Sequence, residues 1–202
     1  MNKLKYLLYL AFAGLMLPFT SCEDPDLNPY LEPETAVHGL GAFSSGSPTS
    51  FKVGDMNTPV KFDLQWVSID SKNTVTKMEV FVTYTEKYID PERNPRTANH
   101  GTKRIVTIEG SNVPANRKAA SFTISPAQVY ELFKANKFNY GTGSVDVFAN
   151  AARTAASRFT TNDGFRITWA FTTADGRFFD SWSDSVCLEF PGANCSLSWA
   201  AK

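Results

Sequence analysis

Apolar and polar residues alternate over several long segments of the sequence. In residues 60–66 (VKFDLQW), 75–85 (VTKMEVFVTYT) and 164–171 (GFRITWAF), every second side chain is apolar over most of the segment. A period of two is typical of a β-strand with one buried face. Residues 102–110 and 119–125 hold further short apolar stretches with β-branched residues. We predict antiparallel strands in all five segments.

A short helix and a long loop are predicted between these strands. Ser125 and Pro126 are typical of a helix start, with serine as the N-cap and proline at the first helical position. Residues 86–101 are polar, contain two prolines and are predicted to form a loop. With short strands expected at residues 144–149 and near the end of the sequence, about eight strands are predicted. We therefore predict a mostly β fold, an immunoglobulin-like antiparallel β-sandwich with one short helix.

The dipeptide Asp175-Gly176 predicts a hairpin turn with two alternative registers. A two-residue turn would place Asp180 opposite Phe171 on the apolar face, where an unpaired acid is costly. A type I turn followed by a glycine bulge would instead pair Thr173 with Arg177 and place Phe179 opposite Phe171. We predict the second register, because it brings two phenylalanines together and leaves the acid outside.

The second register places Phe178 and Trp182 on the other face of the hairpin. Exposed aromatic rings bind sugars by stacking against their C–H faces, so these two residues are the candidate ligand platform. The alternative is that both rings are covered by the helix or by a loop. Arg177, beside the turn, is interpreted as a solvated residue rather than a ligand contact.

Composition and charge exclude several classes of function. Aromatic residues make up 13% of the chain, which is enough for a substantial core. If Lys3 and Lys5 are removed with a signal peptide, 18 basic residues remain against 20 acidic ones, a net charge of −2. This balance provides no basic surface for nucleic acid and no polybasic patch for anionic lipid. We predict no cofactor and no metal site, because the only two histidines lie far from the cysteines.

The first residues of the sequence are typical of a secretory signal. Lys3 and Lys5 precede an apolar run from Leu7 to Phe19, which is short for a membrane span. The residues Phe19-Thr20-Ser21-Cys22 resemble the lipobox of bacterial lipoproteins, in the looser form found in Bacteroidota. The resemblance implies a signal peptide over residues 1–21 and lipidation of Cys22. The alternative is an ordinary secreted protein in which this cysteine has no special role.

Residues 22–50 are predicted to be a flexible tether between the lipidated cysteine and a β-sandwich domain over residues 51–202. The tether segment is rich in proline and glycine. Its acidic start, Glu23-Asp24-Pro25-Asp26, resembles the surface-export signal of Bacteroidota lipoproteins, although a solvated acidic linker is an alternative. The predicted location is therefore the outer membrane, anchored by lipid and facing the cell surface.

Cys187 and Cys195 flank the turn-forming dipeptide Pro191-Gly192. A hairpin centred on that dipeptide would bring the two cysteines opposite one another. Because an exported protein meets an oxidising compartment, we predict a disulfide between them, with two free thiols as the alternative.

Several motifs between residues 120 and 200 resemble a group of Bacteroidota lipoproteins encoded beside Sus-like glycan-uptake systems. The motifs are Asp163-Gly164 at the start of a strand, the turn Asp175-Gly176-Arg177 followed by the aromatic Phe179, and a late cysteine, Cys187 or Cys195. The strand and helix from Phe122 to Phe133 also fit. The resemblance implies a fold and a setting beside an outer-membrane transporter and its binding lipoprotein. It implies no catalytic residues.

No catalytic motif of a hydrolase, metalloprotease, phosphate-binding or dinucleotide-binding enzyme is present in the sequence. A carboxylate pair for glycoside hydrolysis would have to come from five acids in or near predicted strands, Asp63, Glu79, Asp146, Asp180 and Glu189. We therefore predict a non-enzyme: a surface-exposed accessory lipoprotein of a Sus-like uptake system that binds glycan or its protein partners. The alternative is a structural or adhesion lipoprotein, such as a fibre accessory subunit, without a soluble ligand.

Overall fold

The computed structural model describes residues 35–149, 153–180 and 194–202. The chain divides into two units, residues 1–34 and residues 35–202, and every described residue belongs to the second. The elements of this unit, in chain order, are β1 (Val37–Phe43), β2 (Val60–Ser68), β3 (Val75–Ile89), β4 (Pro95–Glu109), the short 3-10 helix η1 (Gly110–Asn112), β5 (Ala119–Ile124), α2 (Pro126–Phe133), β6 (Lys137–Asn139), β7 (Ser144–Asp146), β8 (Asp163–Thr173), β9 (Phe178–Phe179) and β10 (Leu197–Ala200).

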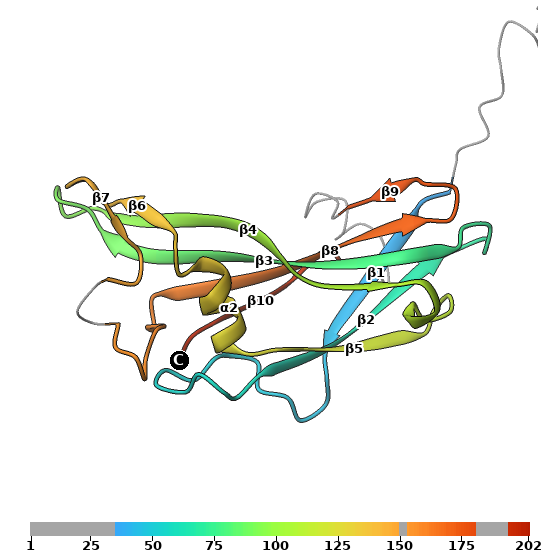
Figure 1. Ribbon diagram of the computed structural model, residues 1–202, viewed down its shortest axis with the longest axis horizontal. Helices are drawn as coiled ribbons and strands as arrows, with labels where there is room; N and C mark the ends of the chain where they lie inside the picture. Colours follow the sequence, from blue (N-terminus) through green and yellow to red (C-terminus); the bar gives the residue numbers. More distant parts are fainter. Residues whose placement is uncertain (1–34, 150–152, 181–193) are drawn as a thin grey trace, which may run out of the picture. The chain divides into compact units, whose positions relative to one another are not determined.

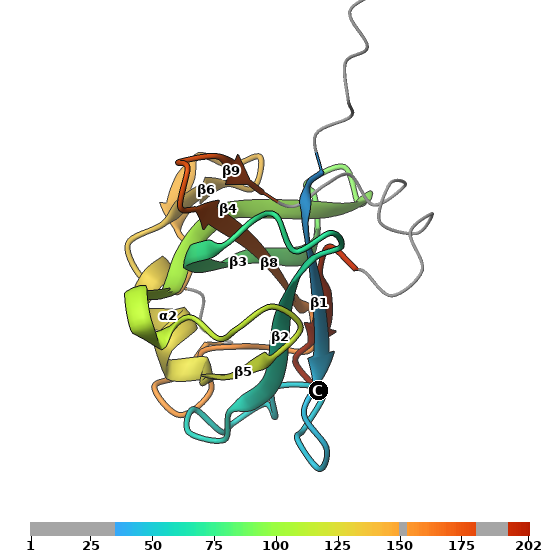
Figure 2. The same cartoon turned by 90° about the vertical axis from the view of Figure 1, so that its right-hand side faces the viewer.

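Two antiparallel sheets form the sandwich (Figure 1). The first has three strands in the order β1-β2-β5, and the second has five, in the order β10-β8-β3-β4 with β9 also paired to β8. Figure 2 shows β2 and β5 in one layer and β3, β8 and β4 in the other, with α2 along one side. The predicted mostly β sandwich with one short helix is therefore confirmed for the described residues. The small β6–β7 sheet lies outside these two layers.

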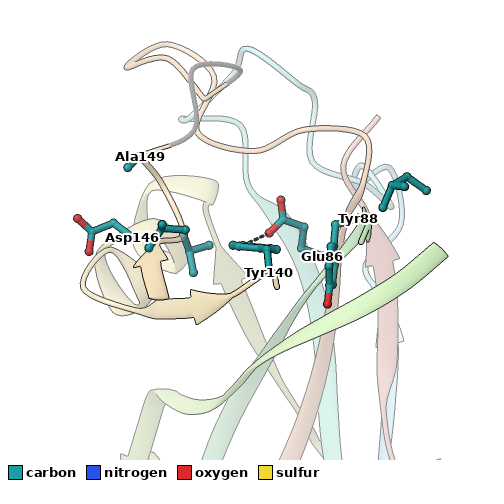
Figure 3. A pocket seen from close by; sticks show the side chains of 8 residues that line it. Glu86, Tyr88, Tyr140, Asp146 and Ala149 are labelled. Carbon is teal, nitrogen blue, oxygen red and sulfur yellow. Dashed lines mark hydrogen bonds between the residues drawn. The ribbon is translucent and has the colours of Figure 1, made fainter. Parts of the chain in front are cut away.

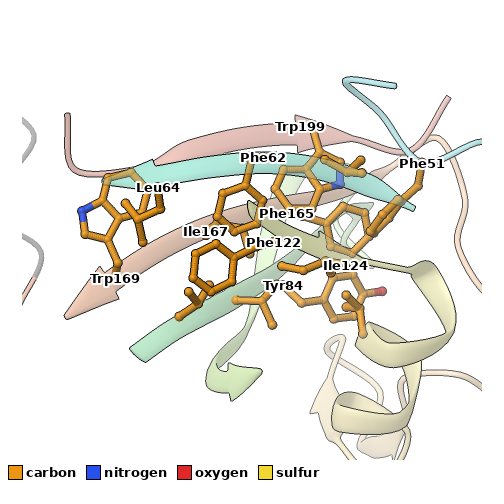
Figure 4. Packing of buried hydrophobic residues seen from close by; sticks show 14 of the residues in the cluster. Phe51, Phe62, Leu64, Tyr84, Phe122, Ile124, Phe165, Ile167, Trp169 and Trp199 are labelled. Atoms are coloured by element: carbon orange, nitrogen blue, oxygen red, sulfur yellow. The ribbon is translucent and has the colours of Figure 1, made fainter. Parts of the chain in front are cut away.

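The core lies between the sheets, where the alternating residues of the predicted strands meet (Figure 4). Phe62 and Leu64 of β2 are fully buried, as are Met78, Val80 and Val82 of β3. The inward residues of β8 are at most 3% exposed, namely Phe165, Ile167, Trp169 and Phe171. Each such side chain contributes about 1.5–3 kcal/mol through burial of apolar surface. The period of two in the sequence therefore identified the buried faces of β2, β3 and β8.

Strand β1 corrects the predicted boundary between tether and domain. Residues 37–43 lie inside the predicted tether of residues 22–50, but they pair with most of β2, from Val37 opposite Ser68 to Phe43 opposite Phe62. The inward positions hold Gly39 and Gly41 because the Trp169 indole lies against them. A Cβ added at Gly39 would lie 2.0 Å from Nε1 of this ring. The compact unit therefore begins at Thr35 rather than at residue 51.

The β3–β4 hairpin corrects the predicted loop of residues 86–101. Strand β3 continues to Ile89 and β4 begins at Pro95, so only five residues form the turn. Asp90 stabilises this turn, because its carboxylate accepts hydrogen bonds from the Asn94 backbone N–H (2.6 Å) and from Arg96 Nε (2.9 Å). Proline is tolerated at the first residue of a strand, which explains why Pro95 does not prevent pairing.

The helix start and the hairpin register are confirmed. Ser125 Oγ accepts a hydrogen bond from the Gln128 backbone N–H (3.2 Å), and the Gln128 side chain accepts one from the Ser125 backbone N–H (2.8 Å), which forms a capping box. In the hairpin, Phe171 pairs with Phe179, and the Thr173 N–H donates to the Arg177 carbonyl (3.0 Å). The bulge needs a residue with positive φ, and Gly176 supplies it at +85°.

The sandwich is closed by residues far apart in the sequence. Phe51 forms a parallel bridge with Ala201. The Lys202 backbone N–H donates to the Phe51 carbonyl (2.8 Å), and the Val53 N–H donates to the Lys202 carbonyl (2.7 Å). The segment after β1 therefore leaves the first sheet and pairs beside β10 of the second.

Candidate functional site

A pocket of about 480 Å³ lies beneath the outer end of the β3–β4 hairpin (Figure 3). Its walls come from the end of β3, from the residue after β6, and from β7 with the residues that follow it. In Figure 3, Asp146 and Ala149 lie on one side of Tyr140, and Glu86 and Tyr88 lie on the other. The lining residues are Glu86, Tyr88, Ile89, Tyr140, Val145, Asp146, Val147 and Ala149.

Two tyrosine rings form a corner of the pocket. The ring centroids of Tyr88 and Tyr140 are 5.0 Å apart and their planes are at 87° to each other. Phe138 on β6 supports both rings, at 6.0 Å from Tyr88 and 4.9 Å from Tyr140. The β6–β7 turn holds Tyr140 in place, because the Asn139 side chain accepts hydrogen bonds from two backbone N–H groups of that turn. The rings are therefore fixed before any ligand arrives.

The apolar rim of the pocket is exposed. Ile89 is 65% exposed and Val145 is 45% exposed, and both line the pocket. Large exposed apolar side chains are otherwise few among the described residues, where only Ile69 and Phe178 join these two. Apolar side chains gathered at a concave site are typical of binding surfaces.

Glu86 is one of two acidic residues that line the pocket, and it has three polar neighbours. The Tyr140 hydroxyl donates to its Oε2 (2.5 Å), and a guanidinium nitrogen of Arg153 donates to its Oε1 (2.5 Å). His100 Nε2 lies 3.4 Å from Oε2. Burial of Glu86 acts to raise its pKa, but its contacts with His100, Tyr140 and Arg153 outweigh that effect and lower the pKa to about 2.

Behind Glu86 lies a buried ionic network centred on Arg153. This residue belongs to the irregular segment that precedes β8, and its guanidinium donates to both carboxylate oxygens of Asp163, at 2.7 and 2.9 Å. The Tyr84 hydroxyl also donates to Asp163 (2.8 Å). The side chains of Arg153 and Asp163 are 1% and 0% exposed. Although burial acts to lower the pKa of Arg153, the hydrogen bonds and charges of its partners raise it, so the guanidinium stays charged.

Burial raises the pKa of both tyrosines in the network. Burial of Tyr84 and the neighbouring charge of Asp163 raise the pKa of its hydroxyl well above the ordinary value. Burial and the hydrogen bond to Glu86 do the same for Tyr140. Both hydroxyls therefore remain protonated donors. His100 completes the network from β4, with its side chain fully buried and its ring 4.5 Å from that of Tyr84.

The residues predicted as site residues lie elsewhere or outside the described residues. Cys22, Trp182 and Cys187 lie outside them, so lipidation and the Phe178–Trp182 platform stay predictions. Cys195 is 5% exposed and disulfide-bonded, but its pairing with Cys187 also stays a prediction. Phe178 lies on β9 in the predicted register, is 56% exposed rather than covered, and is not part of the pocket.

The acids considered for glycoside hydrolysis do not converge in the described residues. Asp63 accepts a hydrogen bond from Ser121 on the three-stranded sheet (2.6 Å), whereas Glu79 is bound to Arg104 on the five-stranded sheet (2.7 Å). Asp146 lines the pocket, and Asp180 is exposed after β9. Glu189 lies outside the described residues.

Both histidines lie in strands, which corrects their predicted positions in the tether and in a loop. His38 is part of β1, where burial lowers the pKa of its side chain, and His100 is part of β4. Within residues 35–149, 153–180 and 194–202, no three His, Cys, Asp or Glu side chains are grouped so that they could hold a metal ion. In the same residues, no helix is both long enough and apolar enough to cross a membrane.

The sequence did not reveal Glu86, Tyr88, Tyr140 or Arg153 as site residues. One signal was present: the alternation of β3 continues past Tyr84 through Glu86 to Tyr88. The prolines at residues 91 and 95 and the polar residues between them favoured a loop instead. No local pattern relates Arg153 to Glu86, which is 67 positions away.

No protein-family model matches this sequence, and no curated protein matches it either. Among solved structures, a DUF4466 family protein from Parabacteroides merdae, a member of the Bacteroidota, is similar with a TM-score of 0.36 and 9% identity. The match covers 73% of this chain and 43% of that one.

Two further solved structures are similar at a lower level. The sporulation control protein Spo0M from Bacillus subtilis has a TM-score of 0.28 and 8% identity, over 72% of this chain and 46% of that one. A β-glucosidase from Listeria innocua, in complex with isofagomine, has a TM-score of 0.28 and 10% identity, over 72% of this chain and 16% of that one. The match spans less than half of each neighbour's length, and similarity this low carries no functional information.

Proposed function

We propose that this protein is a surface-exposed accessory lipoprotein of a Sus-like nutrient-uptake system that binds glycan in the pocket beneath the β3–β4 hairpin. The observation that carries the binding role is the fixed corner of Tyr88 and Tyr140, beside two carboxylates, in a pocket of about 480 Å³. Pockets of this size with aromatic walls and a few polar groups are typical small-molecule sites.

The chemistry of the walls suits a sugar. Aromatic rings stack against the C–H faces of pyranose rings, and carboxylates accept hydrogen bonds from sugar hydroxyls. Tyr88 and Tyr140 supply the rings, while Glu86 and Asp146 supply the acceptors. Because the two rings are already held by Phe138 and the β6–β7 turn, little side-chain entropy is lost on binding.

The electrostatics of the pocket support binding rather than catalysis. A glycosidase needs a carboxylic acid that is protonated near neutral pH beside a second carboxylate. Glu86 has the opposite property, since its contacts lower its pKa to about 2. Asp163, the other carboxylate bound to Arg153, is 1% exposed. It already accepts two hydrogen bonds from Arg153 and one from Tyr84.

The lipid anchor and the uptake system rest on the sequence. The lipobox-like residues ending at Cys22 and the acids after it support an anchored, surface-facing position. A pocket for a single sugar unit on such a protein would collect glycan near a transporter rather than transport it.

Affinity electrophoresis of the full-length protein in gels containing different polysaccharides tests this function. We expect retardation by at least one polysaccharide, and loss of that retardation in Tyr88→Ala. Phe178→Ala is the matched control, because it removes an exposed aromatic ring outside the pocket. Retardation that is lost in Phe178→Ala but kept in Tyr88→Ala would assign binding to the β9 platform instead. No retardation by any polysaccharide, together with no co-purification of an outer-membrane transporter, would refute the proposed function.

A further inference from the structure

We propose that the pocket selects ligands that carry a positively charged amine, so that the glycan it takes is one with free amino groups. This inference rests on the proposed function and names the substrate class of the same site. The carrying observation is the combination of a perpendicular tyrosine pair with an excess of negative charge in and behind the pocket.

The charge excess is a property of the lining and of the network behind it. The lining contains two carboxylates, Glu86 and Asp146, and no Lys, Arg or His. Arg153 is the cation bound to Glu86, but it is shared with Asp163, which it contacts through both guanidinium NH groups. Behind the pocket, the carboxylates of Glu86 and Asp163 share the single guanidinium of Arg153, and Asp146 adds a further carboxylate to the lining. A cation entering the pocket would complete the balance.

The neighbouring cations do not cancel this charge. Lys137 lies 3.7 Å from Asp146, but its side chain is 66% exposed and that of Asp146 is 56% exposed, so the pair is weak in water. Lys103 donates to the Leu132 carbonyl (2.6 Å) and to the Asn136 side chain (2.8 Å), and Arg158 is stacked over the Tyr130 ring. None of these three lines the pocket.

The tyrosine corner adds a second attraction for the same group. Ammonium groups bind to the faces of aromatic rings, and binding strengthens where water is partly excluded. The ring faces carry the negative pole of the aromatic quadrupole. The Glu86 carboxylate is bonded to the hydroxyl of one of the two rings, so one small cation can meet both a ring face and a carboxylate. A neutral sugar would use the rings but would leave the charge excess unbalanced.

Three β-1,4-linked hexasaccharides that differ at C2 of each sugar separate these contributions. Chitosan hexaose carries an amine, chitohexaose an acetamide and cellohexaose a hydroxyl. We would measure binding to the full-length protein by isothermal titration calorimetry, at a pH at which the sugar amines are protonated. The amine-bearing ligand is expected to bind about tenfold more tightly than the other two, which is the scale of a partly desolvated cation–π contact.

Variants test whether the preference comes from this pocket. Asp146→Asn is expected to reduce the preference for chitosan hexaose two- to fivefold, about the effect of one exposed ion pair, and Glu86→Gln is expected to reduce it further. Glu109→Gln is the matched control, because Glu109 is an exposed carboxylate at the opposite end of β4. Tyr88→Leu is expected to weaken binding of all three ligands.

The outcomes separate this inference from the proposed function. Equal binding of all three hexasaccharides, abolished by Tyr88→Leu, would overturn the amine preference and leave glycan binding in place. A preference that falls as much in Glu109→Gln as in Asp146→Asn would also overturn it, because the attraction would then be general. No binding of any of the three, with no retardation by any polysaccharide, would reject both.

Discussion

Strand β8 has an arginine–aspartate pair near each of its ends, and the two pairs lie in opposite environments. At its start, Arg153 and Asp163 have side chains that are 1% and 0% exposed. After its end, Arg177 and Asp175 are 35% and 55% exposed, with Arg177 Nε 2.8 Å from the Asp175 carboxylate. The buried pair joins β8 to β3 through Glu86 and Tyr84. The exposed pair stabilises one turn, from which Arg177 also donates a hydrogen bond to Asn73. The same two residue types therefore form a buried ionic network at one end of β8 and a largely exposed ion pair in a turn at the other.

Arg153→Met is expected to have the largest effect on the stability of the fold. Removal of the guanidinium leaves Glu86 and Asp163 buried without their cation, which costs about 3–5 kcal/mol in comparable buried pairs. We expect the free energy of unfolding, measured by urea denaturation, to fall by that amount. Arg177→Met is the matched control and should change it several-fold less. Equal effects of the two variants would mean that the buried network does not stabilise the fold.

Lowering the pH is expected to destabilise the buried network at the start of β8. The pKa of Glu86 is about 2 in the folded protein, against an ordinary value of 4.5, so its ionised form stabilises the fold at pH above 4.5. That contribution, about 3 kcal/mol, is lost progressively as the pH falls from about 5 toward 2. Urea denaturation of wild type and Glu86→Gln across this range should show a steeper loss in wild type. Parallel curves for the two proteins would contradict the assignment.

Tyr140→Phe tests how much one hydrogen bond of the buried network contributes to the free energy of unfolding. The variant removes the hydroxyl that donates to Glu86, and hydrogen bonds to charged groups contribute about 1.5–3 kcal/mol. Because water in the pocket can replace the donor, we expect a loss of about 1 kcal/mol in the free energy of unfolding. Tyr88→Phe is the control, since its hydroxyl has no hydrogen-bond partner within the described residues. A loss of the same size in the control would point to packing rather than to the hydrogen bond.

Asp175→Asn should have the smallest effect of the four. Its carboxylate accepts hydrogen bonds from Thr173 and Arg177. The amide oxygen of asparagine can still accept the first, and water can replace the second at this exposed turn. We expect a shift of the urea midpoint smaller than that of Tyr140→Phe. A larger shift would show that the turn, rather than the buried network, limits stability.

The sequence predicted the elements whose stability depends on local patterns. The alternation in β2, β3 and β8 identified their buried faces, and the capping residues Ser125 and Gln128 mark the start of α2. The hairpin register followed from one comparison, whether an acid or a phenylalanine faces Phe171. In each case the deciding residues are close together in the chain.

The missed elements depend on residues that are distant in the chain. Strand β1 has glycines at two inward positions, so its apolar alternation is absent, and Trp169 fills the space from β8. The hairpin beyond Tyr84 looked like a loop because both of its strands are polar there. The candidate site combines Glu86, Tyr140 and Arg153, which no spacing rule connects.

The bridge between Phe51 and Ala201 has a consequence for the order of folding. This contact joins residues about 150 positions apart, and β10, beside it, follows every other described strand in the chain. Contacts of such long range form late and slow the folding of β proteins. During synthesis, the second sheet cannot be completed until β10 has been made, because β10 pairs with β8 and lies next to the residue that bridges to Phe51. We therefore expect the growing chain to complete its fold only after β10 has been made.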